Sequence, residues 1–216
     1  MIKAVLFDLD GTLLNTLQDL NTCMNMTLQQ FGYPTISVEQ TKEFVGNGGK
    51  KYAERALPVS ERGRLDEFYA AYNKIHVSFK NENTALYPQE EECLKLLKLK
   101  GIKIAIVTNK SQAGADVLKN SILKPFDFDV VYGNREGVPV KPAPDGAFSV
   151  LKELGIEAEE AVFVGDGETD VETARNAGMR CVSVLWGYRT KEQLISAGAK
   201  IFAENYDELY KILLLM

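Results

Sequence analysis

The sequence predicts an α/β fold, a doubly wound parallel sheet covered by helices, with a helical insertion after its first strand. Five short apolar runs have the composition of strands and are separated by segments with helical periodicity. The runs are continuous rather than alternating, as expected for strands buried on both faces of a parallel sheet. The gap between the first two runs is much longer than a crossover connection needs, which indicates the insertion.

The five predicted strands are rich in aliphatic and β-branched residues, and each ends close to a polar residue or a glycine. They span residues 3–7, 102–107, 128–132, 161–164 and 180–185. The third run, which contains an aspartate, Asp129, among its apolar residues, carries the weakest pattern. This Rossmann-like order of strands and helices predicts one α/β core.

Residues 16–83 are predicted to form a helical cap domain, and residues 1–15 and 84–216 to form the core. The stretch 17–31 carries apolar residues at three- and four-residue spacing before Gly32. Ser37 and Gln40 form a capping box that predicts a second helix. An apolar stripe from Leu65 to Phe79 predicts a third helix, and the hinges are expected near residues 13–16 and 80–86.

Composition excludes several classes of function. The chain has 216 residues and a net charge of −5, without a basic stripe, so we expect no nucleic-acid partner. It has no apolar stretch of membrane-spanning length and no signal peptide, so we expect a cytoplasmic protein without a membrane partner. The three cysteines are widely spaced, as in a reducing compartment. The single histidine, His76, excludes a multi-histidine zinc site, which leaves carboxylates, hydroxyls and lysines for chemistry.

Four polar clusters follow predicted strands or loops, at the edge where open α/β sheets bind ligands. Each cluster alone also fits a solvated turn or a helix cap. Together they supply carboxylates, a hydroxyl and a lysine, which predicts an oxygen-rich site for Mg²⁺ and phosphate. The clusters are Asp8-Leu9-Asp10-Gly11-Thr12, Thr108-Asn109-Lys110, Lys141-Pro142 and Gly165-Asp166 with Asp170.

In order and spacing, these clusters resemble the four motifs of the haloacid dehalogenase-like phosphohydrolase superfamily, over residues 2 to about 190. The insertion falls where that family carries its mobile helical cap, of the C1 type. At position 10 this chain has an aspartate, as the phosphatases and phosphomutases of that superfamily do. Its dehalogenases carry a tyrosine at this position and its P-type ATPases a threonine, so the chain resembles the former group.

The resemblance implies a Mg²⁺-dependent phosphatase that works through an aspartyl-phosphate. Asp8 would be the nucleophile, and Asp10 would protonate the leaving oxygen and then deprotonate water. Asp10 is expected to point away from the metal and to hold a proton. Mg²⁺ would be held by the carboxylates of Asp8 and Asp166 and by the backbone carbonyl of Asp10. The phosphoryl oxygens would contact Thr108, the backbone of Asn109 and Lys141, with Asp170 orienting Lys141 or a metal-bound water.

Two loops resemble those of phosphoglycolate phosphatases, residues 45–49 in the cap and residues 185–189 after the fifth strand. Gly48 would help to place backbone N–H groups over a small substrate carboxylate, although this loop equally fits a helix connector. The favoured substrate, a small phosphorylated metabolite, is therefore 2-phosphoglycolate. An inorganic pyrophosphatase, a nucleotidase and a β-phosphoglucomutase-like sugar phosphomutase remain alternatives. Arg189 is either a specificity residue or a solvated arginine.

Some residues depart from the family pattern and leave the substrate open. Asn15-Thr16 stands where many relatives have Asp-Ser, and Gly167-Glu168 replaces a serine-containing stretch. The cap histidine that phosphomutases carry soon after the first motif is missing, which disfavours an isomerase. His76 is expected to be a packed core residue. A catalytically silent relative would lack some of the required side chains, which are all present here, and the chain is expected to be a monomer or a homodimer.

Overall fold

The computed structural model describes residues 2–216, so Met1, part of the predicted core, lies outside it. Within this range the main sheet has six parallel strands in the order β5-β4-β1-β6-β7-β8, which confirms the predicted fold class. Each of the five predicted strands is present. The strands are β1 (Ala4–Phe7), β4 (Lys103–Ser111), β5 (Val130–Asn134), β6 (Ala161–Gly165), β7 (Arg180–Val184) and β8 (Phe202–Ala203).

Three short strands were not predicted. Strand β8 adds one more parallel strand beside β7. Strands β2 (Leu14–Asn15) and β3 (Ala85–Leu86) form a separate antiparallel pair, within the expected hinges. Each of the three has only two residues, too few to show the alternation from which a strand is predicted.

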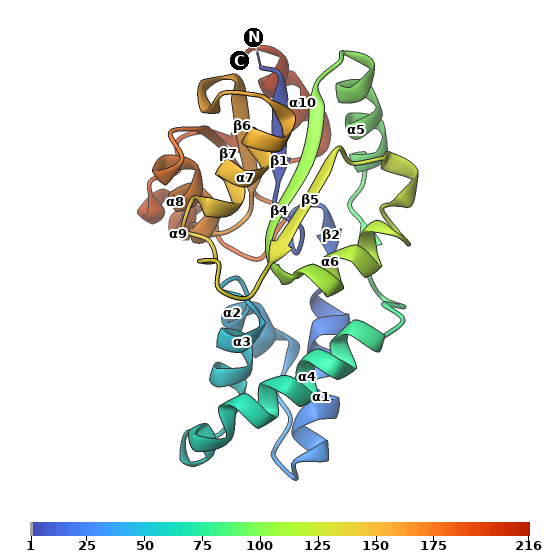
Figure 1. Cartoon of the computed structure of the whole chain (residues 1–216), viewed down its shortest axis with the longest axis vertical. Helices are drawn as coiled ribbons and strands as arrows, with labels where there is room; N and C mark the ends of the chain where they lie inside the picture. Colours follow the sequence, from blue (N-terminus) through green and yellow to red (C-terminus); the bar gives the residue numbers. More distant parts are fainter. Residues whose placement is uncertain (1) are drawn as a thin grey trace.

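The two faces of the main sheet bury alternate side chains of its strands. In β1, Val5 and Phe7 join one apolar cluster, while Ala4 and Leu6 join another on the opposite face. Helices of the core cover both faces, as Figure 1 shows. The first face is covered by α5 (Glu90–Leu99), α6 (Gln112–Lys119) and α10 (Tyr206–Leu214), the second by α7 (Asp145–Leu154) and α8 (Glu168–Asn176), with α9 (Lys191–Ala197) packed on α8.

Residues between β2 and β3 form a helical unit at the end of the molecule farthest from the two termini (Figure 1). Its helices are α1 (Leu17–Gln30), α2 (Val38–Phe44), α3 (Gly49–Ala56) and α4 (Leu65–Ser78). They bury a separate apolar cluster around Leu28, Tyr52 and Phe68. The capping box of Ser37 and Gln40 is confirmed, whereas α3 was not predicted as a separate helix. The domain boundaries at residues 16 and 83 stay a prediction.

The two connections between the core and the helical unit are bonded to each other. Besides the β2–β3 pair, the buried carboxylate of Asp19 in α1 accepts hydrogen bonds from the backbone N–H of Asn83 and, at 2.6 Å, from the hydroxyl of Thr84. A charged acceptor with several donors makes strong hydrogen bonds. The entering and leaving chains are therefore tied together at the base of the helical unit.

The register of the sheet brings the predicted polar clusters to one edge. Phe7 pairs with Ile106 of β4 and with Val164 of β6, so Asp8 leaves the sheet beside the ends of both neighbours. Strands β4 and β6 lie on opposite sides of β1, so the order of the strands reverses at β1. Ligands of open α/β sheets bind at such a switch point. No helix within residues 2–216 is both long and apolar enough to cross a membrane.

Glu90, the first residue of α5, is a fully buried carboxyl outside the four polar clusters. Its Oε2 accepts a hydrogen bond from the backbone N–H of Tyr87, and its Oε1 has no hydrogen-bond partner among residues 2–216. Burial raises the pKa of Glu90 from 4.5 to about 9. The folded protein therefore keeps a proton at neutral pH that the unfolded chain releases.

We expect Glu90 to make the free energy of unfolding fall as pH rises from about 4.5 to about 9, because only the folded state binds the proton there. The slope is at most about 1.4 kcal/mol per pH unit. Urea unfolding measures the free energy of unfolding of both proteins at pH 6 and pH 8. From pH 6 to pH 8, the value for Glu90→Gln should rise by up to about 2.7 kcal/mol relative to that of the wild type. The exposed Glu91→Gln variant is the control, and an equal difference at both pH values would contradict this expectation.

Candidate active site

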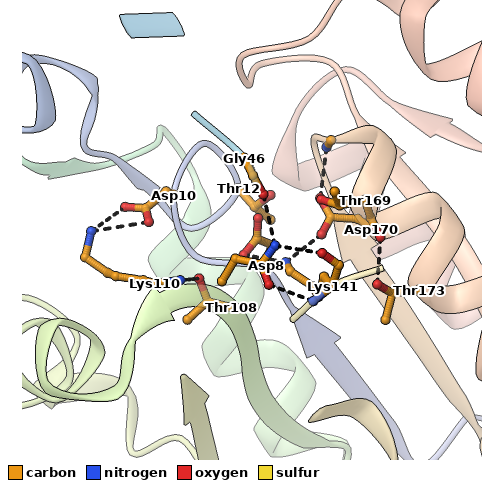
Figure 2. Close-up of polar contacts among 12 residues, drawn as sticks. Asp8, Asp10, Thr12, Gly46, Thr108, Lys110, Lys141, Thr169, Asp170 and Thr173 are labelled. Atoms are coloured by element: carbon orange, nitrogen blue, oxygen red, sulfur yellow. Dashed lines mark hydrogen bonds and ion pairs between the residues drawn. The ribbon is translucent and has the colours of Figure 1, made fainter. Parts of the chain in front are cut away.

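Three carboxylates and one lysine form the centre of the site. Figure 2 labels Asp8, Asp170 and Lys141 among them. Asp8 follows β1, Asp166 follows β6, and Asp170 lies in the first turn of α8; one carboxylate oxygen of each lies within 4.8 Å of those of the other two. The Nζ atom of the buried Lys141 lies 2.8 Å from Oδ1 of Asp8 and 2.7 Å from Oδ1 of Asp170. A buried lysine is retained only when such partners compensate its lost hydration.

The cluster holds more negative than positive charge. Burial raises the pKa of Asp8 to about 8, helped by Asp170 and Asp166 and opposed by Lys141. Burial and Asp170 raise the pKa of Asp166 to about 6. Burial opposes the charge of Lys141, but Asp170 and Asp8 hold its pKa above the ordinary range of a lysine. One ammonium therefore does not neutralise three neighbouring carboxylates.

This excess of negative charge fits a hard divalent cation. Oδ1 of Asp8 is buried, and although it forms an ion pair with Lys141 it receives no well-oriented hydrogen bond from the described residues. A buried carboxylate oxygen without a well-oriented hydrogen bond is costly, and carboxylate oxygens are the ligands that Mg²⁺ prefers. Asp8, Asp166 and Asp170 are close enough for their carboxylates to hold a metal ion, but both oxygens of Asp170 already accept hydrogen bonds, from Lys141 and Gly167, which leaves Asp8 and Asp166 as the better ligands.

Asp166 is fixed between two loops that depend on glycine. Its two oxygens accept hydrogen bonds from the Thr12 hydroxyl at 2.9 Å and from the backbone N–H of Tyr188 at 2.8 Å. A Cβ on Gly11, where φ is +90°, would lie 2.4 Å from Oδ2 of Asp166, and one on Gly187 would lie 2.2 Å from its Cβ. Side chains at either position would displace the carboxylate, which explains both glycines.

The loop after β7 supports the Asp8 loop as well. The backbone carbonyl of Thr12 accepts hydrogen bonds from the indole N–H of Trp186 at 3.0 Å and from the hydroxyl of Tyr206 at 2.8 Å. These contacts join residues more than 170 positions apart in the sequence. The segment 185–189, singled out by resemblance alone, thus positions the first motif.

Asp10 lies apart from this cluster (Figure 2). Its carboxylate accepts a 2.6 Å hydrogen bond from the Thr16 hydroxyl and is paired with Nζ of Lys110 at 2.9 and 3.2 Å. Burial favours its neutral form, but Lys110 and Thr16 together hold the pKa of Asp10 below its ordinary value. The side chain points away from the three clustered carboxylates, and its pairing with Lys110 favours the ionised form over the expected proton.

The phosphate-binding residues of the prediction lie together at the end of β4. The side-chain amide of Asn109 donates to the Lys141 and Gly46 carbonyls, both at 3.0 Å, and its oxygen accepts from the Lys141 N–H at 2.8 Å. Thr108 lies buried beside it and accepts a hydrogen bond from the Lys110 N–H. Only the backbone of Asn109 was expected to matter, yet its side chain connects the helical unit to Lys141.

Arg189 connects the helical unit to the core. Its guanidinium pairs with Glu168 at 3.0 Å and donates to the carbonyls of Lys42 at 2.7 Å and Val45 at 2.6 Å. It is therefore not a solvated arginine, and its contacts give it a structural part in joining the helical unit to the core. In the sequence, Arg189 was singled out because it belongs to the segment Trp186-Gly187-Tyr188-Arg189. Nothing in the neighbouring sequence indicated which groups it would contact.

A cavity of about 80 Å³ lies between the helical unit and the core, over Asp8 and Asp10. One water needs about 10–15 Å³ of cavity volume, so this cavity has room for only a few small groups. Gly48, at the start of α3, lines it. His76 lies at its wall, stacked on Tyr72 at 5.5 Å between ring centres, and burial together with Lys110 lowers the pKa of His76 to about 3. His76 is thus packed, as expected, and it is neutral.

Comparisons with known proteins agree with this geometry. Residues 5–184 match the family model described as haloacid dehalogenase-like hydrolase. The chain is 34% identical over 197 residues to a phosphoglycolate phosphatase of Pseudomonas syringae pv. tomato, covering 86% of this chain and 70% of that protein. It is 31% identical to a phosphoglycolate phosphatase of Vibrio parahaemolyticus, over 98% of this chain and 96% of that protein. The crystal structure of CbbY from Rhodobacter sphaeroides in complex with phosphate is 27% identical and superposes with a TM-score of 0.81, covering 97% and 96%.

We expect Arg189→Gln to loosen the segment 42–46, because the variant loses a charge-assisted contact to two of its carbonyls. Loss of about 1–2 kcal/mol of hydrogen bonding should raise the amide exchange rates there by about tenfold, as read by hydrogen–deuterium exchange. Arg175→Gln, an exposed arginine of α8, is the matched control. Unchanged exchange in residues 42–46 of the Arg189 variant would contradict the contact.

Proposed function

Because this chain belongs to the haloacid dehalogenase-like hydrolases and is a phosphoric monoester hydrolase, we propose that it is a Mg²⁺-dependent phosphatase acting on 2-phosphoglycolate. The observation that carries the proposal is the buried Lys141 between Asp8 and Asp170, with Asp166 beside them, under a small cavity. Such a cluster stabilises charge on a phosphoryl group that is transferred to a carboxylate.

In the first half of the reaction, a carboxylate oxygen of Asp8 attacks phosphorus and forms an aspartyl-phosphate. The ester P–O bond breaks, and its electron pair goes to the leaving oxygen, which takes a proton from Asp10. In the second half, Asp10 takes a proton from a water whose oxygen attacks phosphorus. The bond to Asp8 breaks, its electron pair returns to the carboxylate, and inorganic phosphate leaves.

Asp8, Asp166 and the Asp10 backbone carbonyl would hold Mg²⁺, which when bound supplies positive charge next to the phosphoryl oxygens. Lys141 supplies the second positive charge, held in place by Asp170 at 2.7 Å. Thr108 and the backbone of Asn109 lie at the end of β4, next to Lys141, and donate to the same oxygens. Since Asp10 must carry a proton when the ester bond breaks, its contact with Lys110 has to loosen in the substrate complex.

The charge of the cavity supports a small anionic substrate over the alternatives. Five carboxylates line the cavity, which favours a compact anion bound with a cation, and a phosphomutase would need the missing cap histidine. The cavity is lined by five carboxylates and two cations, so a dianionic ester binds only if a divalent cation offsets the repulsion. The named activity of the Pseudomonas and Vibrio relatives supports 2-phosphoglycolate over pyrophosphate.

We expect Asp8→Asn and Asp10→Asn to fail in different ways. Without its nucleophile the enzyme should lose kcat by about 10³-fold or more for every ester. Without its general acid, the Asp10→Asn enzyme should lose about 10²–10⁴-fold in kcat for 2-phosphoglycolate. Its rate of forming the aspartyl-phosphate from p-nitrophenyl phosphate should fall much less, because that leaving group needs no proton. Burst kinetics with both esters measure this difference, and the exposed Asp207→Asn is the control. Near-normal turnover by Asp8→Asn would overturn its assignment.

We expect phosphate release to stop in EDTA and to return with Mg²⁺, because the acidic cavity repels the substrate when no cation is present. A panel of 2-phosphoglycolate, pyrophosphate, nucleoside monophosphates and β-glucose 1-phosphate, assayed for phosphate release, should rank 2-phosphoglycolate first by kcat/KM. Assay of the last compound for glucose 6-phosphate tests the mutase alternative. Full activity in EDTA, or a higher rank for another compound, would contradict the corresponding part of the proposal.

A further inference from the structure

We propose that Lys110 binds the carboxylate of the substrate's leaving group and so selects phosphomonoesters that carry a carboxylate next to the ester CH₂. The proposal rests on the proposed phosphatase function and deepens it. It assigns the recognition of the leaving group to a residue of the core, at the end of β4, rather than to the loop of the helical unit alone.

Lys110 is a buried cation at the wall of the substrate cavity. Its side chain is only 4% exposed, and its Nζ contacts the two oxygens of a single carboxylate, that of Asp10. An ammonium has three N–H donors, so at least one remains for a further acceptor. At such low exposure, attraction to a second anion is much stronger than at the protein surface.

Other cations near the cavity are occupied. Arg189 donates to Glu168 and to two carbonyls of the helical unit, and Lys141 is held between Asp8 and Asp170. His76, which faces Lys110 from α4, is neutral. Of the two cations that line the cavity among the described residues, Arg189 already connects the helical unit to the core, whereas Lys110 contacts Asp10 alone and is the better placed to bind a substrate group.

The chemistry of the ester places a carboxylate within reach of Lys110. The proposed acid Asp10 must contact the ester oxygen, and in 2-phosphoglycolate the carboxylate carbon lies two bonds beyond that oxygen. An ammonium 2.9 Å from Asp10 is thus next to the carboxylate of a bound substrate. Five carboxylates line the cavity, so this group would be repelled if no cation faced it.

The test compares 2-phosphoglycolate with ethyl phosphate, which has a methyl group in place of the carboxylate. For Lys110→Gln, and for Lys110→Met as a second variant, we expect kcat/KM for 2-phosphoglycolate to fall at least about tenfold further than for ethyl phosphate, mainly through KM. Lys110→Arg should retain most of the preference, because it keeps the charge. Thermal unfolding checks that each variant is folded.

The ratio of the two esters separates the possible outcomes. An effect of Lys110 on Asp10 alone would slow both esters equally, so an unchanged ratio in the folded variants would overturn the proposal. A wild-type enzyme that hydrolyses neither ester would instead overturn the proposed function. Equal use of both esters by the wild type would overturn the selection of a carboxylate while leaving a phosphatase in place.

Discussion

The contact on which the site depends is that of the buried Lys141 with two carboxylates, Asp8 at 2.8 Å and Asp170 at 2.7 Å. A lone buried ammonium or carboxylate would be prohibitively costly, so each of these groups requires the others. The sheet serves this contact by ending β1 and β6 at one edge, and Gly11 and Gly187 leave the space that Asp166 occupies beside it. A cluster with more carboxylates than cations is unfavourable by itself and favours binding of a divalent cation.

The helical unit is coupled to that contact through two side chains of the core. Asn109 bonds the Gly46 carbonyl with the same amide group that holds the Lys141 backbone, and Arg189 bonds the neighbouring Val45 carbonyl. The loop of the helical unit and the backbone of Lys141 are therefore held by one shared set of hydrogen bonds.

Sequence reasoning was most successful where information is local. Buried strands are recognised by their apolar runs, and Ser37 with Gln40 by the spacing of a capping box, so the fold class and most elements were predicted. The two-residue strands β2, β3 and β8 have no such pattern. Contacts such as Lys110 with Asp10, 100 residues apart, arise only when the chain has folded, and they changed the expected state of Asp10 from protonated to ionised. Lys110 was visible beside Asn109, but nothing local revealed its partner.

Formation of a covalent phosphoryl group on Asp8 is the central claim for this enzyme, because it distinguishes attack by the carboxylate from direct attack by water. The most direct measurement is rapid acid quench of the wild-type enzyme during turnover of 2-phosphoglycolate with Mg²⁺, followed by mass spectrometry of the N-terminal peptide. We expect the mass increment of one phosphoryl group on Asp8, appearing before free phosphate accumulates. An unmodified Asp8 at every quench time, while phosphate is released at the full rate, would contradict it.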